Sequence, residues 1–182
     1  MSIIQYIIFF FFFLNVTLCQ ATECEIHLSQ PVVNYQNIST EDFVSSHGKW
    51  SSLDTREIQV STQCSEPVQI ANAFSNLNSG RKFTMGKNSI VEIVASDAYL
   101  DGHPVKLGKS TSEESFTLAH SGRQRVLVLA GNTVVPVING QIPSGQHLEY
   151  RLTLKPHINE ADLHPEDQNT LDANVFTTVL FQ

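Results

Sequence analysis

The sequence predicts an all-β protein, and three observations support this prediction. Short stretches alternate apolar and polar residues with the period of two that a half-buried strand requires. Clusters of Gly, Asn, Asp, Ser and Pro separate these stretches, as turns do. No window of about 11 or more residues carries an apolar stripe with the 3.6-residue period of a helix.

The first 21 residues differ from the rest of the chain. Ile3 to Leu14 are almost wholly apolar and include five consecutive phenylalanines from Phe9 to Phe13. This run of roughly 12 residues is shorter than the ~20 that span a bilayer, but it suits the apolar core of a secretory signal. We predict a signal peptide over 1–21, cleaved after Ala21, and hence an exported protein. Removing 21 residues from 182 leaves 161, which fits one domain over 22–182.

The composition restricts the partners. Charged residues make up 16% of the chain, against about 25% in typical soluble domains. Ser, Thr, Asn and Gln replace them, as is common in exported β-proteins. The net charge of −7 argues against nucleic acid or an anionic membrane surface as a partner. No second long apolar segment follows the signal, so we expect no membrane insertion.

The cysteine count depends on the same cleavage. Cys19 lies in the signal, which leaves Cys24 and Cys64, an even number in an oxidising compartment. A Cys24–Cys64 disulfide would close a loop of about 40 residues and restrict the unfolded chain by roughly 4 kcal/mol. The alternative, a lipoprotein acylated at Cys19, is disfavoured because Leu18 stands where a small residue is needed.

The first predicted strands follow from alternation. Residues 57–64 place Ile58 and Val60 on one face, and 68–71 repeat the pattern after Pro67. Residues 89–95 form a short apolar run that leads to a turn at Asp101-Gly102.

The later strands are equally short. Residues 123–130 and 133–138 end at Gly131-Asn132 and Asn139-Gly140, and 147–154 place Leu148, Tyr150, Leu152 and Leu154 on one face. The last strand covers 173–181. Further turns are predicted at 78–80, 86, 108, 121–122 and 143–145, and 159–170 has room for one helical turn at most. About eight such strands predict an antiparallel β-sandwich or barrel.

Two segments resemble catalytic or nucleotide-binding motifs but lack essential parts. Gly102 to Ser110 has five residues where a phosphate-binding loop has four, includes Pro104, and precedes no helix, so we predict a turn. Ala119 to Gly122 lacks the upstream glycine of a nucleophile elbow, so we predict a surface turn. A secreted hydrolase therefore has no assembled set of residues, and we expect no enzyme, catalytic residue or cofactor.

The densest group of metal-ligating residues is His157 to Asp167. It offers four carboxylates and two imidazoles, which suit a hard cation or a transition metal. It lacks the glycine that bends a calcium loop, so we predict a solvated acidic loop, with a metal site as the alternative. Asn37-Ile38-Ser39 is a glycosylation sequon, which matters only in a eukaryotic source.

Several short segments resemble bacterial chaperone–usher fimbrial subunits. Cys24 to Leu28 and Val32 to Tyr35 resemble the first strand of these pilins, and Thr62 to Ile70 resembles the second. Leu152 to Pro156 and Leu171 to Phe181 resemble their closing strands. The chain ends in Phe181-Gln182, where many pilins have a Tyr just before the terminus.

The resemblance implies an immunoglobulin-like antiparallel β-sandwich that lacks its seventh strand. A periplasmic chaperone, and then a neighbouring subunit, fills the resulting groove by adding a strand. The implied partners also include an outer-membrane usher, and the implied location is the periplasm and then the fimbrium, cell surface or medium. The residues expected to border the groove are Val175, Phe176, Thr177, Val179, Leu180 and Phe181.

The resemblance further implies a non-enzymatic fimbrial subunit. Only Thr22-Glu23 precede Cys24 after cleavage, so the chain could accept a strand but not donate one, as a tip adhesin or invasin would. Trp50 and Tyr99 are candidate contacts for a host or surface receptor, although we expect packing roles for both. The alternative is a self-contained secreted β-sandwich that binds carbohydrate or protein.

Overall fold

The computed structural model describes residues 22–35, 38–77, 80–110, 116–163 and 171–182. It confirms the all-β prediction, because every strand pair is antiparallel and helix in the described residues is limited to two 3₁₀ turns, η1 (Thr40–Asp42) and η2 (Glu160–Asp162). The predicted signal peptide and Asn37 lie outside these ranges. The strands are β1 (Cys24–Leu28), β2 (Ser45–His47), β3 (Trp50–Ser52), β4 (Arg56–Ser75), β5 (Phe83–Met85), β6 (Ser89–Leu100), β7 (His103–Ser110), β8 (Arg125–Val128), β9 (Asn132–Val137), β10 (Ser144–Asn159) and β11 (Phe176–Phe181).

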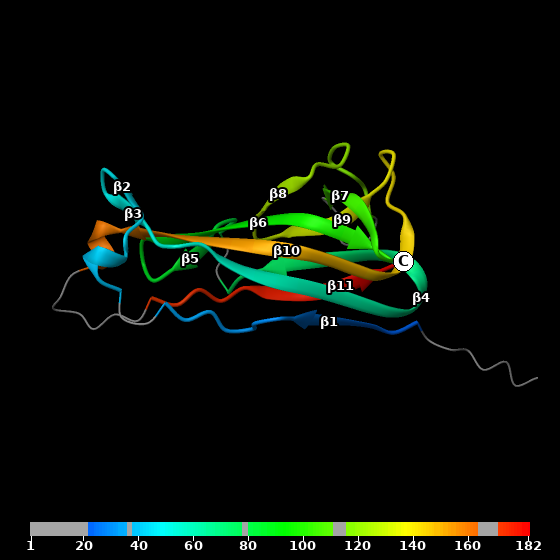
Figure 1. The fold of residues 1–182 in the computed structure, drawn as a ribbon, viewed down its shortest axis with the longest axis horizontal. Coiled ribbons are helices and arrows are strands. Elements are labelled where there is room, and N and C mark those ends of the chain that lie inside the picture. The colour runs from blue at the N-terminus through cyan, green and yellow to red at the C-terminus, as the bar shows by residue number, and fades with distance from the viewer. Residues whose placement is uncertain (1–21, 36–37, 78–79, 111–115, 164–170) are drawn as a thin grey trace, which may run out of the picture.

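Five of the strands close into a ring of hydrogen-bonded pairs. β4 pairs with β9, β9 with β7, β7 with β6, β6 with β10, and β10 returns to β4. Closure is possible because β4 is 20 residues long and turns back on itself near the C-terminus (Figure 1). Its first half belongs to one layer of the fold and its second half to the other.

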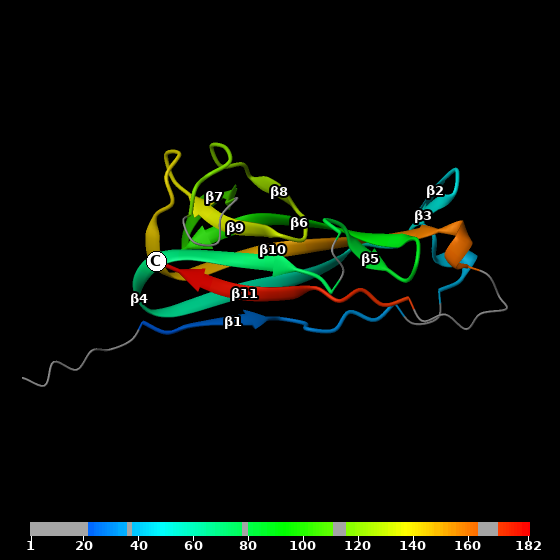
Figure 2. The same ribbon diagram turned by 180° about the vertical axis from the view of Figure 1, so that it is seen from behind.

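β1 and β11 lie outside this ring. β1 pairs with the first half of β4, where Cys24 is opposite Cys64, and β11 pairs with the second half, where Val179 is opposite Asn72. Each half of β4 therefore has one neighbour in the ring and one outside it. The two outer strands run along the same side of the molecule, as Figures 1 and 2 show.

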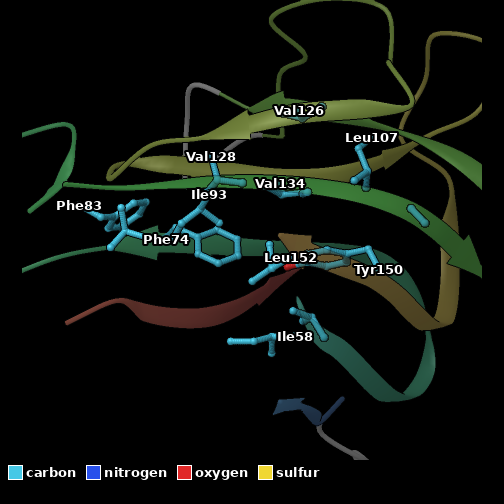
Figure 3. Close-up of a cluster of buried hydrophobic side chains, with 14 of the residues drawn as sticks. Ile58, Phe74, Phe83, Ile93, Leu107, Val126, Val128, Val134, Tyr150 and Leu152 are labelled. Carbon is cyan, nitrogen blue, oxygen red and sulfur yellow. The ribbon is translucent and has the colours of Figure 1, made fainter. Parts of the chain in front are cut away.

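The core lies between the two layers. Alternate residues of β4 and β10, such as Val60 and Tyr150, point inward and are fully buried. Figure 3 shows how the side chains of opposite strands interdigitate, with Phe74 and Ile93 near the centre. A smaller cluster is formed by Ala71, Val135, Val137 and Ile142. Within the described ranges, no helix has the length and hydrophobicity needed to cross a membrane.

Two predicted turns are confirmed, and their backbone dihedral angles identify the turn type. Asp101 and Gly102 have φ values of 50° and 77° and join β6 to β7, and Asn139 and Gly140 have 51° and 78°. Positive φ at both central residues defines the type I′ turn, which suits the twist of two-residue hairpins. The bend at Ala119 to Gly122 is also on the surface, as predicted.

The prediction of separate strands before and after Pro67 is wrong, because β4 is continuous. Pro67 lies at the bend of β4. It follows Cys64, the last residue of β4 that pairs with β1, and precedes Val68, which pairs with β10. Its missing N–H therefore leaves no ladder bond unmade. Proline here bends the strand rather than ending it.

The prediction of a turn over Gly102 to Ser110 is also wrong, because β7 covers most of it. Gly108 lies inside the strand, and a Cβ atom there would come within 2.8 Å of side-chain atoms of Leu118 and Val137. The glycine is thus required by close packing and not by a turn. The strands β2, β3 and β5 were not predicted, because they are three residues each and too short for a clear alternation.

Candidate functional site at two open strand edges

The candidate site lies between β1 and β11, which are in contact but do not pair. β1 pairs only with β4, and so does β11, so no described strand occupies the outer edge of either. We call the strip between β1 and β11 the seam. Unpaired strand edges present free backbone N–H and C=O groups, which is the chemistry that an added strand uses.

β11 is only half covered. Thr177 and Val179 are half-buried on the side that faces the main core, and Val175 just before the strand packs there too. Phe176 and Phe181 are 46% and 41% exposed. Leu180 packs on the smaller cluster with Ala71. No residue of β11 is fully buried, whereas Ile70, Asn72 and Phe74 opposite it are.

The opposite border of the seam has the same character. Ile26 and Leu28 of β1 are half-buried and pack against the main core, and Glu25 and His27 point to solvent. Both edges therefore carry apolar side chains that pack against the main core and are themselves only half-buried. An extended segment placed between them would complete this burial.

The predicted disulfide is confirmed and holds one border of the seam. Cys24 and Cys64 are directly opposite in the ladder, with an S–S distance of 2.07 Å. The Ser65 N–H donates to the Glu23 carbonyl at 2.9 Å and extends the pairing beyond the disulfide. β1 is thus attached to β4 covalently as well as by hydrogen bonds.

A buried polar cluster fixes the spacing of the two halves of β4 beneath the seam. The Asn72 amide donates to Thr62 Oγ1 at 3.0 Å and to Tyr150 Oη at 2.9 Å, and Thr62 Oγ1 donates to Asn72 Oδ1 at 3.1 Å. Burial raises the pKa of the Tyr150 phenol far above its usual range, and the bond from Asn72 offsets part of that rise. The phenol therefore stays neutral and the cluster does not titrate.

Two other buried side-chain atoms have no such partner. Among the described residues, Thr177 Oγ1 and Tyr35 Oη are shielded from solvent without a hydrogen bond. Tyr35 lies on the segment that continues β1, and its ring packs against the same core as Val179. An unsatisfied buried hydroxyl destabilises a protein by roughly 1–3 kcal/mol. Both of these atoms belong to segments that lead into the seam.

The structure places Asp162, from the predicted acidic loop, in a structural role that the sequence analysis missed. Its carboxylate accepts hydrogen bonds from the backbone N–H groups of Asn88 and Ser89 and from both of their side chains, at 2.7–2.9 Å. Burial raises its pKa, but these four bonds outweigh that effect and hold the pKa below its usual value. Ser89 Oγ also accepts from the Asn159 N–H at 2.9 Å, so the end of β10 is tied to the start of β6.

The metal alternative has no support in the described part of this loop. In the described ranges, no group of three His, Cys, Asp or Glu residues is close enough to hold an ion. His164, Glu166 and Asp167 lie outside these ranges. Asp162, the best-connected carboxylate, already has its oxygens occupied by hydrogen-bond donors.

One arrangement of Ser, His and Glu that the sequence did not predict occurs on the outer face. Ser61 Oγ is 2.9 Å from His147 Nε2, and Glu149 Oε1 is 3.4 Å from the same nitrogen. A catalytic triad instead places its acid on the opposite ring nitrogen, where it orients the imidazole. The contacts described here do not provide that arrangement, so they amount to surface hydrogen bonding.

The packing roles expected for Trp50 and Tyr99 are wrong. Trp50 is 38% exposed on the short β2–β3 hairpin, and Tyr99 is 43% exposed on β6. A β-bulge at Asp97, whose φ is 53°, reverses the alternation of β6, so that Ile93 and Ala95 point inward before it and Ala98 and Leu100 after it. Tyr99 therefore faces solvent, although continued alternation from Ile93 would have placed it in the core.

Comparisons with known proteins add little. No family model matches the chain, and no solved structure matches it. An uncharacterized protein of Escherichia coli (strain K12), named YhcE, is 26% identical over 147 residues, which are 79% of this chain and 81% of the relative. The relative carries no assigned activity, so the functional argument rests on the seam.

Proposed function

We propose that this protein is an exported, non-enzymatic fimbrial or fimbria-like subunit that accepts a strand from another chain at the seam. The observation that carries the proposal is the pair of open edges, β1 and β11, whose half-buried apolar side chains pack against the main core. A strand inserted there would gain backbone hydrogen bonds from the exposed edges and bury the apolar side chains beside them.

The strand order supports an immunoglobulin-like sandwich that is one strand short. One layer runs β1–β4–β10–β6 and the other runs β11–β4–β9–β7. The outer side of β11 is the place of the strand that such a sandwich would need to be complete. Under this proposal the added strand comes first from a periplasmic pilus chaperone and then from a neighbouring subunit. An outer-membrane usher would assemble them.

The experiment adds the missing strand covalently. Residues 22–182 are produced in a bacterial periplasm alone, or with a short linker and an alternating apolar strand fused after Gln182. The matched control carries the same fusion with Ser at each apolar position. We expect most of the chain alone to aggregate or be degraded and the recovered soluble fraction to have low stability, and the apolar fusion to be soluble with a melting temperature about 10 °C or more above that of this fraction. A soluble monomer that unfolds sharply at the same temperature in all three forms would contradict the proposal.

The alternative is a self-contained secreted module that binds a carbohydrate or a protein. Two observations favour it. The five-stranded ring closes without any added strand, and a shallow hollow of about 480 Å³ lies beside the C-terminal end of β11. The residues that line the hollow are Gln69, Phe116, Leu118, Gly140, Gln141 and Ile142. This alternative predicts a soluble monomer that unfolds sharply at the same temperature in all three forms, which is the result that contradicts strand acceptance.

A further inference from the structure

The hydrogen-bond state of buried hydroxyls differs between the seam and the interior. In the interior, Thr62, Asn72 and Tyr150 satisfy one another, and Ser89 Oγ has two partners. At the seam, Thr177 Oγ1 is shielded from solvent with no partner among the described residues. A native protein rarely leaves such a group unpaired without a reason, which can be a ligand absent from the structure.

The position of Thr177 along the seam can be derived from the strand registers. Thr177 is opposite Phe74 in one ladder, and Leu28 is opposite Val60 in the other. The Thr62–Asn72 hydrogen bond joins the two halves of β4 two residues away from Val60 and from Phe74. Thr177 and Leu28 therefore lie at the same level on opposite borders, within the length of seam that a strand would occupy.

We infer that the strand received at the seam carries a hydroxyl or carboxamide side chain that hydrogen-bonds Thr177 Oγ1. The inference rests on the proposed function and specifies the chemistry of its partner. With β1 and β11 in contact, the hydroxyl is covered by its neighbours and has no partner. A strand that separates the two edges brings its own inward-facing side chains to the level of Thr177, and one polar group there pairs with the hydroxyl. The unpaired hydroxyl also makes the closed seam less stable than an all-apolar seam would be, which favours opening.

Substitutions at Thr177 test the contribution of its hydroxyl separately from the shape of the side chain. Thr177→Val keeps the shape of the side chain and replaces the hydroxyl by a methyl group, and Thr177→Ser keeps the hydroxyl. Thr178→Val makes the same chemical change on the exposed face of the same strand. We expect Thr177→Val to raise the denaturant concentration at which the free chain unfolds, and Thr178→Val to leave it nearly unchanged.

The probes are labelled peptides of about ten residues in which Val and Thr alternate between terminal lysines, a length suited to one strand. One peptide keeps every Val, and the others carry a single Asn at successive Val positions. Affinity is measured by fluorescence anisotropy. We expect one Asn peptide to bind the unmodified chain and Thr177→Ser about tenfold more tightly than the all-Val peptide. This preference should disappear in Thr177→Val and persist in Thr178→Val.

The possible outcomes test the inference about Thr177 separately from the proposed function. If the all-Val peptide binds but no Asn position shows a preference that depends on Thr177, the inference is overturned and the proposed function stands. A Thr177→Val chain that is less stable than the unmodified protein would also overturn it, since the hydroxyl would then already have a partner. If the folded chain binds none of the peptides, the proposed function fails and the inference fails with it.

Discussion

The two neighbours of the second half of β4 form a natural comparison. Val134 of β9 and Val179 of β11 are both opposite Asn72, one on each side of it. Val134 is 0% exposed, whereas Val179 is only half-buried. β9 has a second ladder, to β7, and β11 has none among the described residues. The same residue type in the same register is thus buried or half-open according to whether a further strand lies beyond it.

The comparison shows that the closed ring and the two open edges share one strand. β4 completes the ring through β10 and β9 and also carries the two open edges, β1 and β11. The ring holds most of the fully buried side chains and the satisfied polar cluster. The seam holds half-buried apolar residues of both edges and the unsatisfied hydroxyl of Thr177. A closed ring therefore carries two open strand edges, an arrangement that suits the strand acceptance proposed here.

The largest expected effect comes from removing the disulfide, which ties the seam to the ring. A chain with both Cys24→Ser and Cys64→Ser should lose about 4 kcal/mol of unfolding free energy, because a closed loop of about 40 residues no longer restricts the unfolded state. Denaturant unfolding measures this loss. The control is the unmodified chain under strong reductant, which should unfold at the same denaturant concentration as the double variant. Unchanged stability in the double variant would show that β1 does not need the crosslink.

The second-largest expected effect is the loss of unfolding free energy when each of the two valines opposite Asn72 is truncated. Val134→Ala should lower the unfolding free energy by about 2–3 kcal/mol, because it leaves a cavity in a fully buried site, and Val179→Ala by about 1 kcal/mol. Denaturant unfolding of the free chains measures both. In a chain with a fused donor strand, the unfolding free energy lost through Val179→Ala should grow towards the value for Val134→Ala. The loss through Val134→Ala should stay constant. Equal losses in the free chains would mean that the seam is as closed as the ring.

The smallest expected effect concerns Asp162, which ties the end of β10 to the start of β6. Its folded pKa lies below the unfolded value, so its contribution to stability is complete above the unfolded pKa of about 4 and is lost as pH falls through the folded pKa. Asp162→Asn should cost about 1–2 kcal/mol at pH 7, allowing for partial exposure of the group.

The measurement is denaturant unfolding of both chains from pH 7 to pH 2. The difference between them should be constant above about pH 5 and should shrink below about pH 4. Asp42→Asn is the comparison at an exposed site: hydrogen bonds from the backbone N–H and side chain of Ser39 lower the pKa of Asp42, so its effect should change with pH in the same direction but be smaller. A difference between Asp162→Asn and the unmodified chain that does not change with pH would rule out this role for the carboxylate.

Much of the fold could be predicted from local sequence, because strands and turns are local. Alternation identified most of β4, half of β10 and all of β11, and the dipeptides Asp101-Gly102 and Asn139-Gly140 identified two type I′ turns. Counting cysteines outside the predicted signal peptide identified the Cys24–Cys64 pair, which the structure confirms. Alternation alone could not place the bulge at Asp97, because the bulge is a feature of the pairing between β6 and β10. The exposure of Tyr99 depends on that bulge.

The sequence by itself determined that this protein is built of strands, where two of its hairpins turn, and that Cys24 and Cys64 are the two cysteines that pair. These features depend on residues adjacent in the chain or on composition alone. Only the tertiary structure decided which strand edges stay open, which hydroxyls are satisfied, and which carboxylate holds the end of β10. Each of these depends on residues that are far apart in the chain, such as Thr62 with Tyr150 or Ser89 with Asp162. Local pattern carries no information about such pairs, because their contact exists only after the two layers have packed.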